Sequence, residues 1–297
     1  MNFHRTMTIQ RLTPSQYPFL LRQIEKQPKF LNLIGQLPLD SYKFLCVIGS
    51  RTHSSYGLNA CKKIISGLRG YPIVIVSGMA IGIDSIAHET ALEVGLKTIA
   101  VPGSGLDDEV LYPPSKKPLA KKIVDAGGAL LSPFENNCSV AKWTFPIRNQ
   151  IMAALSNAVL VIEARKKSGT IITADAAGNC GRNMLAVPGS IFSNLSQGAN
   201  RLIREGATAI TSSSDVLEAL GFELPESYGI HSKDVFLHDS SLSVNERRIL
   251  EYLETPRMRD DLMRELKMSA SELNSVLVEL ELKDIIFEED GYILCQY

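Results

Sequence analysis

The sequence lacks the patterns shared by disulfide-rich, zinc-binding and membrane proteins. Its five cysteines are scattered, with no C-x-x-C pair and no histidine at ligand spacing, so neither a disulfide framework nor a zinc site is expected. No segment reaches the roughly 18 apolar residues of a membrane span, and the N-terminus has no apolar stretch of signal-peptide length. We therefore expect a cytoplasmic protein that needs no membrane, metal or other cofactor.

Net charge is also small, but it is unevenly spread. The chain has 31 Lys and Arg residues against 32 Asp and Glu residues, and residues 240–297 hold 7 of the basic and 13 of the acidic ones. The rest of the chain is therefore positive. If the protein binds nucleic acid, this balance favours a localised basic patch in the larger N-terminal part.

Short apolar runs alternate with segments of helical periodicity. We expect buried strands at 43–48, 72–76, 97–101, 158–162, 184–187 and 207–210. We expect helices at 57–69, 82–95, 116–126, 147–156, 170–181 and 199–205. This alternation predicts an α/β fold, with a Rossmann-like, doubly wound, mostly parallel sheet over residues 40–221. Ligands of such sheets bind at the carboxyl ends of the strands, so function is expected in the loops there.

The pattern changes after residue 221. Residues 222–241 have no periodicity and are expected to be a linker. Residues 242–297 predict a small winged-helix-like domain of three helices and a hairpin. Its third helix would be the recognition helix, but that helix carries three glutamates and a single lysine over 270–283. This charge favours a structural or protein-contact role over DNA binding.

Small residues fill the loops after the first two predicted strands. They are Gly49 and Ser50, followed by Arg51, after the first strand, and Ser77, Gly78, Ala80 and Gly82 after the second. Small residues let backbone N–H groups approach an anion at a helix N-terminus, and the guanidinium of Arg51 suits phosphate. We expect phosphate binding here; the alternative is that the glycines only make tight turns.

Basic and aromatic side chains interleave around the fourth predicted strand. Before it lie Lys142, Trp143, Phe145, Arg148 and Asn149, and after it lie Lys166, Lys167, Ser168, Gly169 and Thr170. Single-stranded nucleic acid needs cations along its backbone and rings on which bases stack. We expect these residues to bind a single strand. The alternative is that the rings pack in the core and the lysines are only solvated.

Three enzyme motifs are absent or weak. The first strand ends in G-S-R, which is not the G-x-G-x-x-G of dinucleotide folds, and the Lys166-Lys167-Ser168-Gly169 segment lacks the first glycine of a P-loop. Asp84 and His88 stand one helical turn apart and could act as a base and its orienting partner. An acid in a first helical turn is more often placed by the helix dipole.

Seven segments together resemble the DNA-processing protein A (DprA/Smf) family over about residues 17–221. They are VIGSR, VSGMAIGIDSIAH, LYPPS, FPIRNQIMAALSNAVLVIEA, SGTIITADAA, GRNMLAVPG and QGANRLIREGA. Residues 1–39 look like the lead-in to that family's Rossmann-like domain, and the SAM-like domain that precedes it in many members is expected to be absent. The C-terminal part is similar to a winged-helix domain found in many members.

The resemblance implies a function. Members bind and protect incoming single-stranded DNA, usually as homodimers, and load the RecA recombinase onto it in natural transformation, with no established catalytic activity. The resemblance places these residues in the DNA pocket: Gly49, Ser50, Arg51, Lys142, Phe145, Arg148 and Asn149. Ile81 departs from the pattern, because the family often has arginine there, and this departure would weaken a phosphate contact.

Two other functions remain open from the sequence. Nucleotide phosphoribohydrolases share an R-N-x-x-M-x-x-x-S-like helix and a P-G-G-x-G-T-x-x-E loop with a catalytic glutamate. Here Thr173 occupies the position of that acid and cannot act as a carboxylate base. A module that senses a nucleotide other than DNA also remains possible, because phosphate cradles do not distinguish a nucleotide from a polymer.

An apolar cluster lies at the end of the large domain, beside the predicted linker. Its members are Val216, Leu217, Leu220 and Phe222. We expect them to form a homodimer interface; the alternative is that they cap the core.

Overall fold

The computed structural model describes residues 8–166, 168–223, 242–253, 257–283, 285–289 and 291–295. The chain divides into two compact units, Met1–Glu223 and Leu224–Tyr297. The expected linker at 222–241 lies outside the described residues, apart from residues 222 and 223. Among the described helices, none is long and apolar enough to cross a membrane.

A nine-stranded sheet, in the order β1-β2-β6-β5-β4-β3-β7-β8-β9, organises the first unit. The strands are β1 (Gln10–Leu12), β2 (Leu31–Gly35), β3 (Lys43–Ile48), β4 (Ile73–Ser77), β5 (Lys97–Ala100), β6 (Ala129–Ser132), β7 (Ala158–Val161), β8 (Asn183–Ala186) and β9 (Thr208–Ala209). Strands β3 to β9 pair in parallel, whereas β1 and β2 pair antiparallel with their neighbours. The central strands read as continuous apolar runs because both of their faces are buried.

The order of the strands reverses beside β3. From β3 the chain moves outward through β4, β5 and β6, then returns to β7 on the other side of β3 and continues to β8 and β9. This reversal makes the sheet doubly wound and brings distant loops together at the carboxyl ends of neighbouring strands. The structure therefore confirms the predicted α/β fold class.

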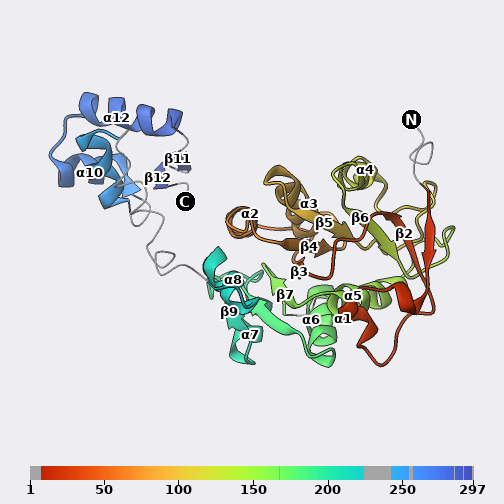
Figure 1. Ribbon diagram of the computed structural model, residues 1–297. Coiled ribbons are helices and arrows are strands. Elements are labelled where there is room, and N and C mark those ends of the chain that lie inside the picture. The colour runs from red at the N-terminus through yellow and green to blue at the C-terminus, as the bar shows by residue number, and fades with distance from the viewer. Residues whose placement is uncertain are drawn as a thin grey trace. The chain divides into compact units, whose positions relative to one another are not determined.

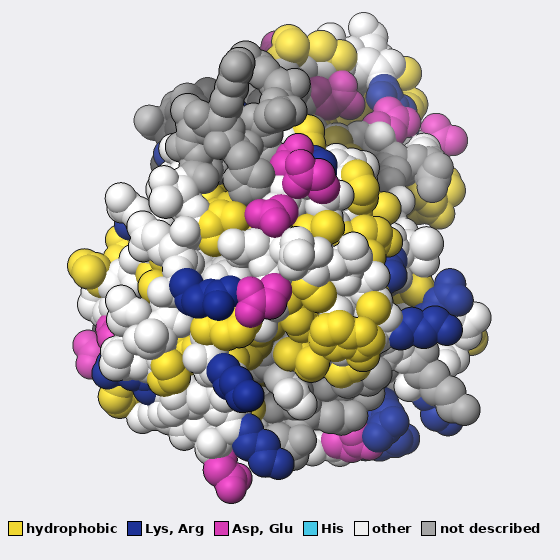
Figure 2. All heavy atoms as spheres, turned by 90° about the vertical axis from the view of Figure 1, so that its right-hand side faces the viewer, with side chains coloured by type: hydrophobic (Ala, Val, Ile, Leu, Met, Phe, Trp, Pro, Cys, Tyr) yellow, Lys and Arg dark blue, Asp and Glu magenta, His cyan; other side chains and the backbone are white. Residues whose placement is uncertain are grey.

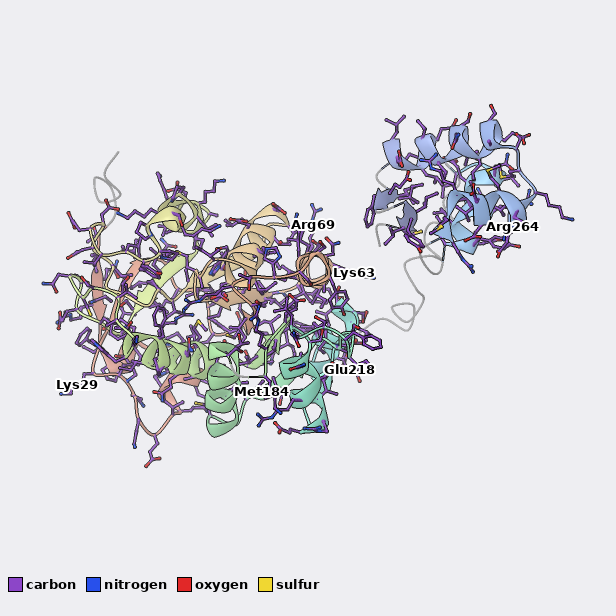
Figure 3. All side chains as sticks on the ribbon, turned by 180° about the vertical axis from the view of Figure 1, so that it is seen from behind. Lys29, Lys63, Arg69, Met184, Glu218 and Arg264 are labelled. Atoms are coloured by element: carbon purple, nitrogen blue, oxygen red, sulfur yellow. The ribbon has the colours of Figure 1, made fainter. Side chains whose placement is uncertain are left out.

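Helices cover both faces of this sheet, as Figure 1 shows: α2, α3 and α4 lie on one face and α5 and α6 on the other. The helices of this unit are α1 (Phe19–Arg22), α2 (Ser55–Ser66), α3 (Ile83–Glu93), α4 (Lys117–Asp125), α5 (Thr144–Leu155), α6 (Gly169–Asn179), α7 (Gln197–Arg204) and α8 (Ser213–Ala219). Side chains fill the layers between the sheet and the helices (Figure 3). The core is therefore packed on both faces of the sheet.

The sheet begins earlier in the chain than expected. The segment 1–39 was assigned to a lead-in outside the domain, but β2 pairs with β6, with Leu33 opposite Leu131, and β1 adds one more strand. The sheet therefore begins before residue 40, the predicted start of the Rossmann-like domain. At the β1 edge, the guanidinium of Arg11 lies 4.1 Å from the centroid of the Phe30 ring. Figure 2 shows hydrophobic side chains lying among Lys and Arg side chains on this side of the molecule.

The second unit is a winged helix with its own core. Its helices are α10 (Val244–Tyr252), α11 (Arg259–Leu266) and α12 (Ala270–Leu282), and β10 (Arg257–Met258), β12 (Tyr292–Cys295) and β11 (Ile286–Glu289) form a sheet in that order. The three predicted helices and the hairpin are present, whereas the short strand β10 was not expected. Leu273, Leu277 and Leu280 of α12 are buried in this core.

Candidate nucleic-acid interface

A pocket lies at the carboxyl ends of β3, β4 and β5, beside the start of α5. Its lining residues come from five segments of the chain: Arg51, Gly78, Ala80, Ile81, Gly103, Tyr112, Pro113, Phe145 and Arg148. The hollow measures about 40 Å³. A buried water needs about 10–15 Å³, so this hollow has room for a phosphate-sized group.

A short network places the ring of Phe145 at this point. The hydroxyl of Thr144, the first residue of α5, donates a hydrogen bond of 2.6 Å to the carbonyl of Gly103. A Cβ added to Gly103 would lie 3.0 Å from the Phe145 ring, so the backbone there approaches the ring closely. The loop after β5 therefore fixes the start of α5 and the position of Phe145.

Two guanidinium groups surround this ring. The guanidinium carbon of Arg51 lies 5.1 Å from the ring centroid of Phe145, and that of Arg148 lies 6.0 Å from it. The ring of Tyr112 meets the same ring edge-on, with 6.4 Å between centroids. Proteins bind single-stranded nucleic acid with cations that contact its phosphates and aromatic rings on which its bases stack.

Arg148 lies at the base of the pocket as a buried cation. Its side chain is 6% exposed, and Nη1 lies 3.6 Å from Oδ2 of the equally buried Asp84. Burial raises the pKa of Asp84, and the charge of Arg148 opposes that shift. Since arginine stays protonated in proteins, a guanidinium lies beneath the pocket, with the Asp84 carboxyl group beside it.

Close packing explains why two of the loop positions are glycines. A Cβ added to Gly78 would lie 1.5 Å from Nη1 of Arg148. Gly82 has a φ of +93°, and a Cβ there would lie 2.3 Å from the carbonyl oxygen of Ser50. The loops after β3 and β4 therefore lie directly against each other and against Arg148.

The loop between β7 and α6 adjoins the pocket through the end of β3. The Thr170 hydroxyl donates to the carbonyl of Gly49 at 3.3 Å. The Ser168 hydroxyl is buried and has no hydrogen-bond partner in the described part of the chain. Lys166 is exposed, while Lys167, which was also predicted to bind DNA, lies outside the described residues. The Ser168 hydroxyl, just before the start of α6, is therefore a donor without a partner among the described residues, at a helix N-terminus, where anions bind.

The pocket brings together five of the residues predicted from the sequence: Arg51, Gly78, Ala80, Phe145 and Arg148. Sequence reasoning missed Gly103, Tyr112 and Pro113 as lining residues, whereas Ile81, singled out as a departure from the family pattern, does line the pocket. Tyr112 and Pro113 belong to the LYPPS segment, which carried the family resemblance but had been given no role. That motif was the signal that could have identified them.

Other predicted residues lie outside the lining. Lys142 is exposed beside the start of α5, and Asn149 is 8% exposed on α5. Ser77 is fully buried, and its hydroxyl donates to the carbonyl of Val47 at 2.6 Å, so it joins β4 to β3. Trp143 is 56% exposed and packs edge-on against Phe134, so it is not a core residue.

Asp84 and Glu163 follow β4 and β7, and both carboxyl groups already have partners. Asp84 pairs with Arg148, and Glu163 accepts hydrogen bonds from the backbone and hydroxyl of Ser54 at 3.0 and 2.5 Å. Nδ1 of His88 contacts the hydroxyl of Thr98 at 2.6 Å. No hydrogen bond joins Asp84 and His88 in the described structure. Thr173, at the position of the phosphoribohydrolase acid, is buried in α6 and donates to the carbonyl of Gly169.

The expected dimer residues are mostly buried within the first unit. Val216 and Leu217 are 0% exposed and Leu220 is 5% exposed. Phe222 meets Tyr71 edge-on, with 5.3 Å between ring centroids. These side chains pack within the first unit, which favours the alternative that they cap the core. A dimer interface at this end of the domain stays a prediction.

Comparison with known proteins identifies the family. The family profile described as DNA recombination-mediator protein A matches residues 8–221, and that of the DprA winged helix domain matches residues 239–291. DNA processing protein DprA of Streptococcus pneumoniae is 42% identical over 206 residues, which cover 69% of this chain and 72% of that protein. Protein Smf of Escherichia coli is 39% identical over 209 residues, which cover 70% of this chain and 55% of that protein.

Solved structures agree with the sequence comparison. DNA processing protein A from Streptococcus pneumoniae has a TM-score of 0.66 at 39% identity, with coverage of 75% of this chain and 77% of that one. DNA processing protein A from Helicobacter pylori, described by its single-stranded DNA binding mode, has a TM-score of 0.65 at 29% identity, with coverage of 74% and 98%. The chain belongs to the DNA recombination-mediator protein A family.

Proposed function

We propose that this protein binds single-stranded DNA at the pocket lined by Arg51, Phe145 and Arg148 and presents it for recombination. The observation that carries this proposal is the approach of two guanidinium groups, at 5.1 and 6.0 Å, to one half-buried aromatic ring. The cations suit the phosphates and the ring suits a base. The relative from Helicobacter pylori has a single-stranded DNA binding mode, which supports the same ligand here.

Binding, and not catalysis, suits the polar groups around the pocket. In the described structure, Asp84 and Glu163 both have partners, and Thr173 replaces the acid of the related hydrolases. A reaction that needs a general base would require an unengaged titratable side chain, such as a histidine or a carboxylate, within hydrogen-bond reach of its substrate. We therefore propose that the protein performs no reaction of its own on the bound strand.

We infer the partners of this protein from its family. We propose that the protein acts in the cytoplasm as a homodimer, protects incoming DNA and loads RecA onto it during natural transformation. The acidic winged helix does not favour DNA: α12 carries Glu272, Glu279 and Glu281, and the DNA backbone would repel them. We propose a protein-contact or structural role for that domain.

Titration of the purified protein tests the ligand. The probes are a labelled single strand of about 20 nucleotides, a duplex of the same sequence, and a nucleoside monophosphate. We expect tight, salt-dependent binding of the single strand and weaker binding of the duplex. Equal affinity for the duplex, or binding of the monophosphate alone, would contradict the proposal and favour a nucleotide-sensing module.

A further inference from the structure

The loop after β8 exposes two neighbouring apolar side chains at its tip. Ile191 is 81% exposed and Phe192 is 92% exposed, which makes Phe192 the most exposed large hydrophobic residue in the described structure. A single exposed apolar residue is ordinary; here two adjacent apolar side chains, one of them an aromatic ring, are both exposed.

Hydrogen bonds hold this loop in place. The side chain of Asn200 accepts from the backbone N–H of Gly189 at 3.1 Å and donates to its carbonyl at 2.9 Å. The hydroxyl of Tyr56 donates to the carbonyl of Pro188 at 2.5 Å, and the hydroxyl of Ser190 accepts from the N–H of Phe192 at 3.2 Å. The ring is therefore presented to solvent by an ordered loop.

The tip is continuous with the candidate interface. The N–H of Ala164 donates to the carbonyl of Leu195 at 2.7 Å, which joins the loop after β8 to the loop after β7. Arg165 and Lys166 follow Ala164 directly and are exposed, and neither has an acidic partner among the described residues. From there, Thr170 contacts the end of β3.

The order of the strands sets the path across this edge. β4, β3, β7 and β8 are direct neighbours in the sheet, and adjacent strands lie about 4.8 Å apart. Residues of the pocket follow β3 and β4, cations follow β7, and Phe192 follows β8. Across the sheet, β8 lies two to three strand spacings, roughly 10–15 Å, from β3 and β4, a span that a few nucleotides of extended single strand would cover.

We propose that Phe192 is a second base-stacking platform for the same single strand, separated from the pocket by the cations of the loop after β7. This inference rests on the proposed function and extends its footprint. Phosphates would pass Arg165 and Lys166, and a base beyond them would stack on the Phe192 ring. A protein partner would need a wider apolar surface, whereas Ser190, Ser193 and Asn194 around the tip are polar.

Oligonucleotides of two lengths test this platform. Fluorescence anisotropy measures the affinity of the full chain for a labelled thymidine dinucleotide, which is too short to reach from the pocket to the tip, and for labelled oligothymidylate of about 20 nucleotides. Phe192→Ala is expected to weaken binding of the longer strand about 5- to 100-fold, with the salt dependence and the affinity for the shorter strand unchanged. Phe192→Trp should bind like the wild type, and Phe192→Leu should lose as much as Phe192→Ala, because leucine keeps apolar bulk but has no ring.

Matched controls make the result decisive. Leu39 is 72% exposed and precedes the amino end of β3, so Leu39→Ala should bind both strands like the wild type. Unchanged binding of the longer strand by Phe192→Ala would overturn the platform, as would wild-type binding by Phe192→Leu or an equal loss for both lengths. A lower molar mass of Phe192→Ala in light scattering would assign the tip to protein contact and also overturn it. If the wild type binds neither strand, the proposed function itself fails.

Discussion

Nη1 of Arg148 lies 3.6 Å from Oδ2 of Asp84, and the backbone of Gly78 passes directly beside this buried pair. Asp84 also accepts a hydrogen bond of 3.4 Å from the N–H of Ala80. One carboxylate therefore holds both the cation at the base of the pocket and the loop at its rim. The loop after β4 and the first turns of α5 are therefore linked through this contact.

Gly78→Ala should disturb both stability and binding. The added methyl group would lie 1.5 Å from Nη1 of Arg148 in the present geometry, so the guanidinium must move from its pair with Asp84. We expect a loss of about 1–3 kcal/mol in the free energy of unfolding, measured by urea denaturation, and weaker binding of a single strand. Gly178→Ala is the matched control, because nothing lies within 4 Å of a Cβ there; it should unfold no more easily than the wild type. Equal stability of the two variants would contradict the packing described for Gly78.

Phosphate contact and base stacking should separate in two variants. Arg51→Ala should weaken binding about equally across sequences and reduce the slope of log affinity against log salt by about 1, because it removes one phosphate contact. Phe145→Ala should cost on the order of 1–3 kcal/mol with the salt slope unchanged, because it removes a ring. Anisotropy titrations over a range of salt concentrations measure both quantities.

Lys142→Ala serves as a comparison, since Lys142 is exposed outside the pocket lining. Its effect should follow the pattern of Arg51→Ala if a phosphate also passes the start of α5. Circular dichroism must show that Phe145→Ala folds. A folded Phe145→Ala protein with wild-type affinity would refute base stacking at this ring.

Stability should fall as the pH falls below 6.5, in part through His88. Burial lowers the pKa of His88 from 6.5 to about 3. Between these values the unfolded chain binds a proton that the folded chain does not, so the folded state loses free energy relative to the unfolded one as the pH decreases. From this group we expect a loss of about 2 kcal/mol between pH 7 and pH 5.

Urea denaturation at several pH values measures this dependence. His88→Gln should remove about 2 kcal/mol of it, whereas His53→Gln, at an exposed histidine, should leave it unchanged. If the two variants show the same pH dependence, His88 is protonated in the folded protein and the assignment is incorrect.

Single-strand binding should survive removal of the winged helix. The pocket lies wholly within the first unit, which has its own core, and residues 240–297 carry 13 acidic against 7 basic residues. A protein ending at residue 223 should keep most of the affinity of the full chain and most of its salt dependence. A truncated protein that folds, as judged by its thermal transition, but binds no single strand would place the DNA site elsewhere.

The sequence was sufficient for β3, β4, β5, β7 and β8, for the helices between them and for the polar loops that follow, but β6 was not predicted. β3 and β7 are visible in it because strands buried on both faces need continuous apolar runs, and a run of that kind needs no knowledge of its partners. β2 was missed because Leu31–Gly35 pairs with Ala129–Ser132, about a hundred residues away, and its assignment depends on that partner. The apolar residues of α8 were expected at a dimer interface, because the periodicity of a sequence shows that a helix face is apolar but not which part of the protein covers it.

Only the tertiary structure decided which of the predicted residues share a site. The reversal of strand order beside β3 and the hydrogen bond from Thr144 to Gly103 bring Arg51 and Phe145 within 5.1 Å, while they leave Lys142 outside the lining and place Tyr112 within it. The type of a residue determines what its side chain can bind, and the type is known from the sequence alone. Its neighbours in space are set by the long-range pairing of strands and the packing of helices, which no local pattern contains.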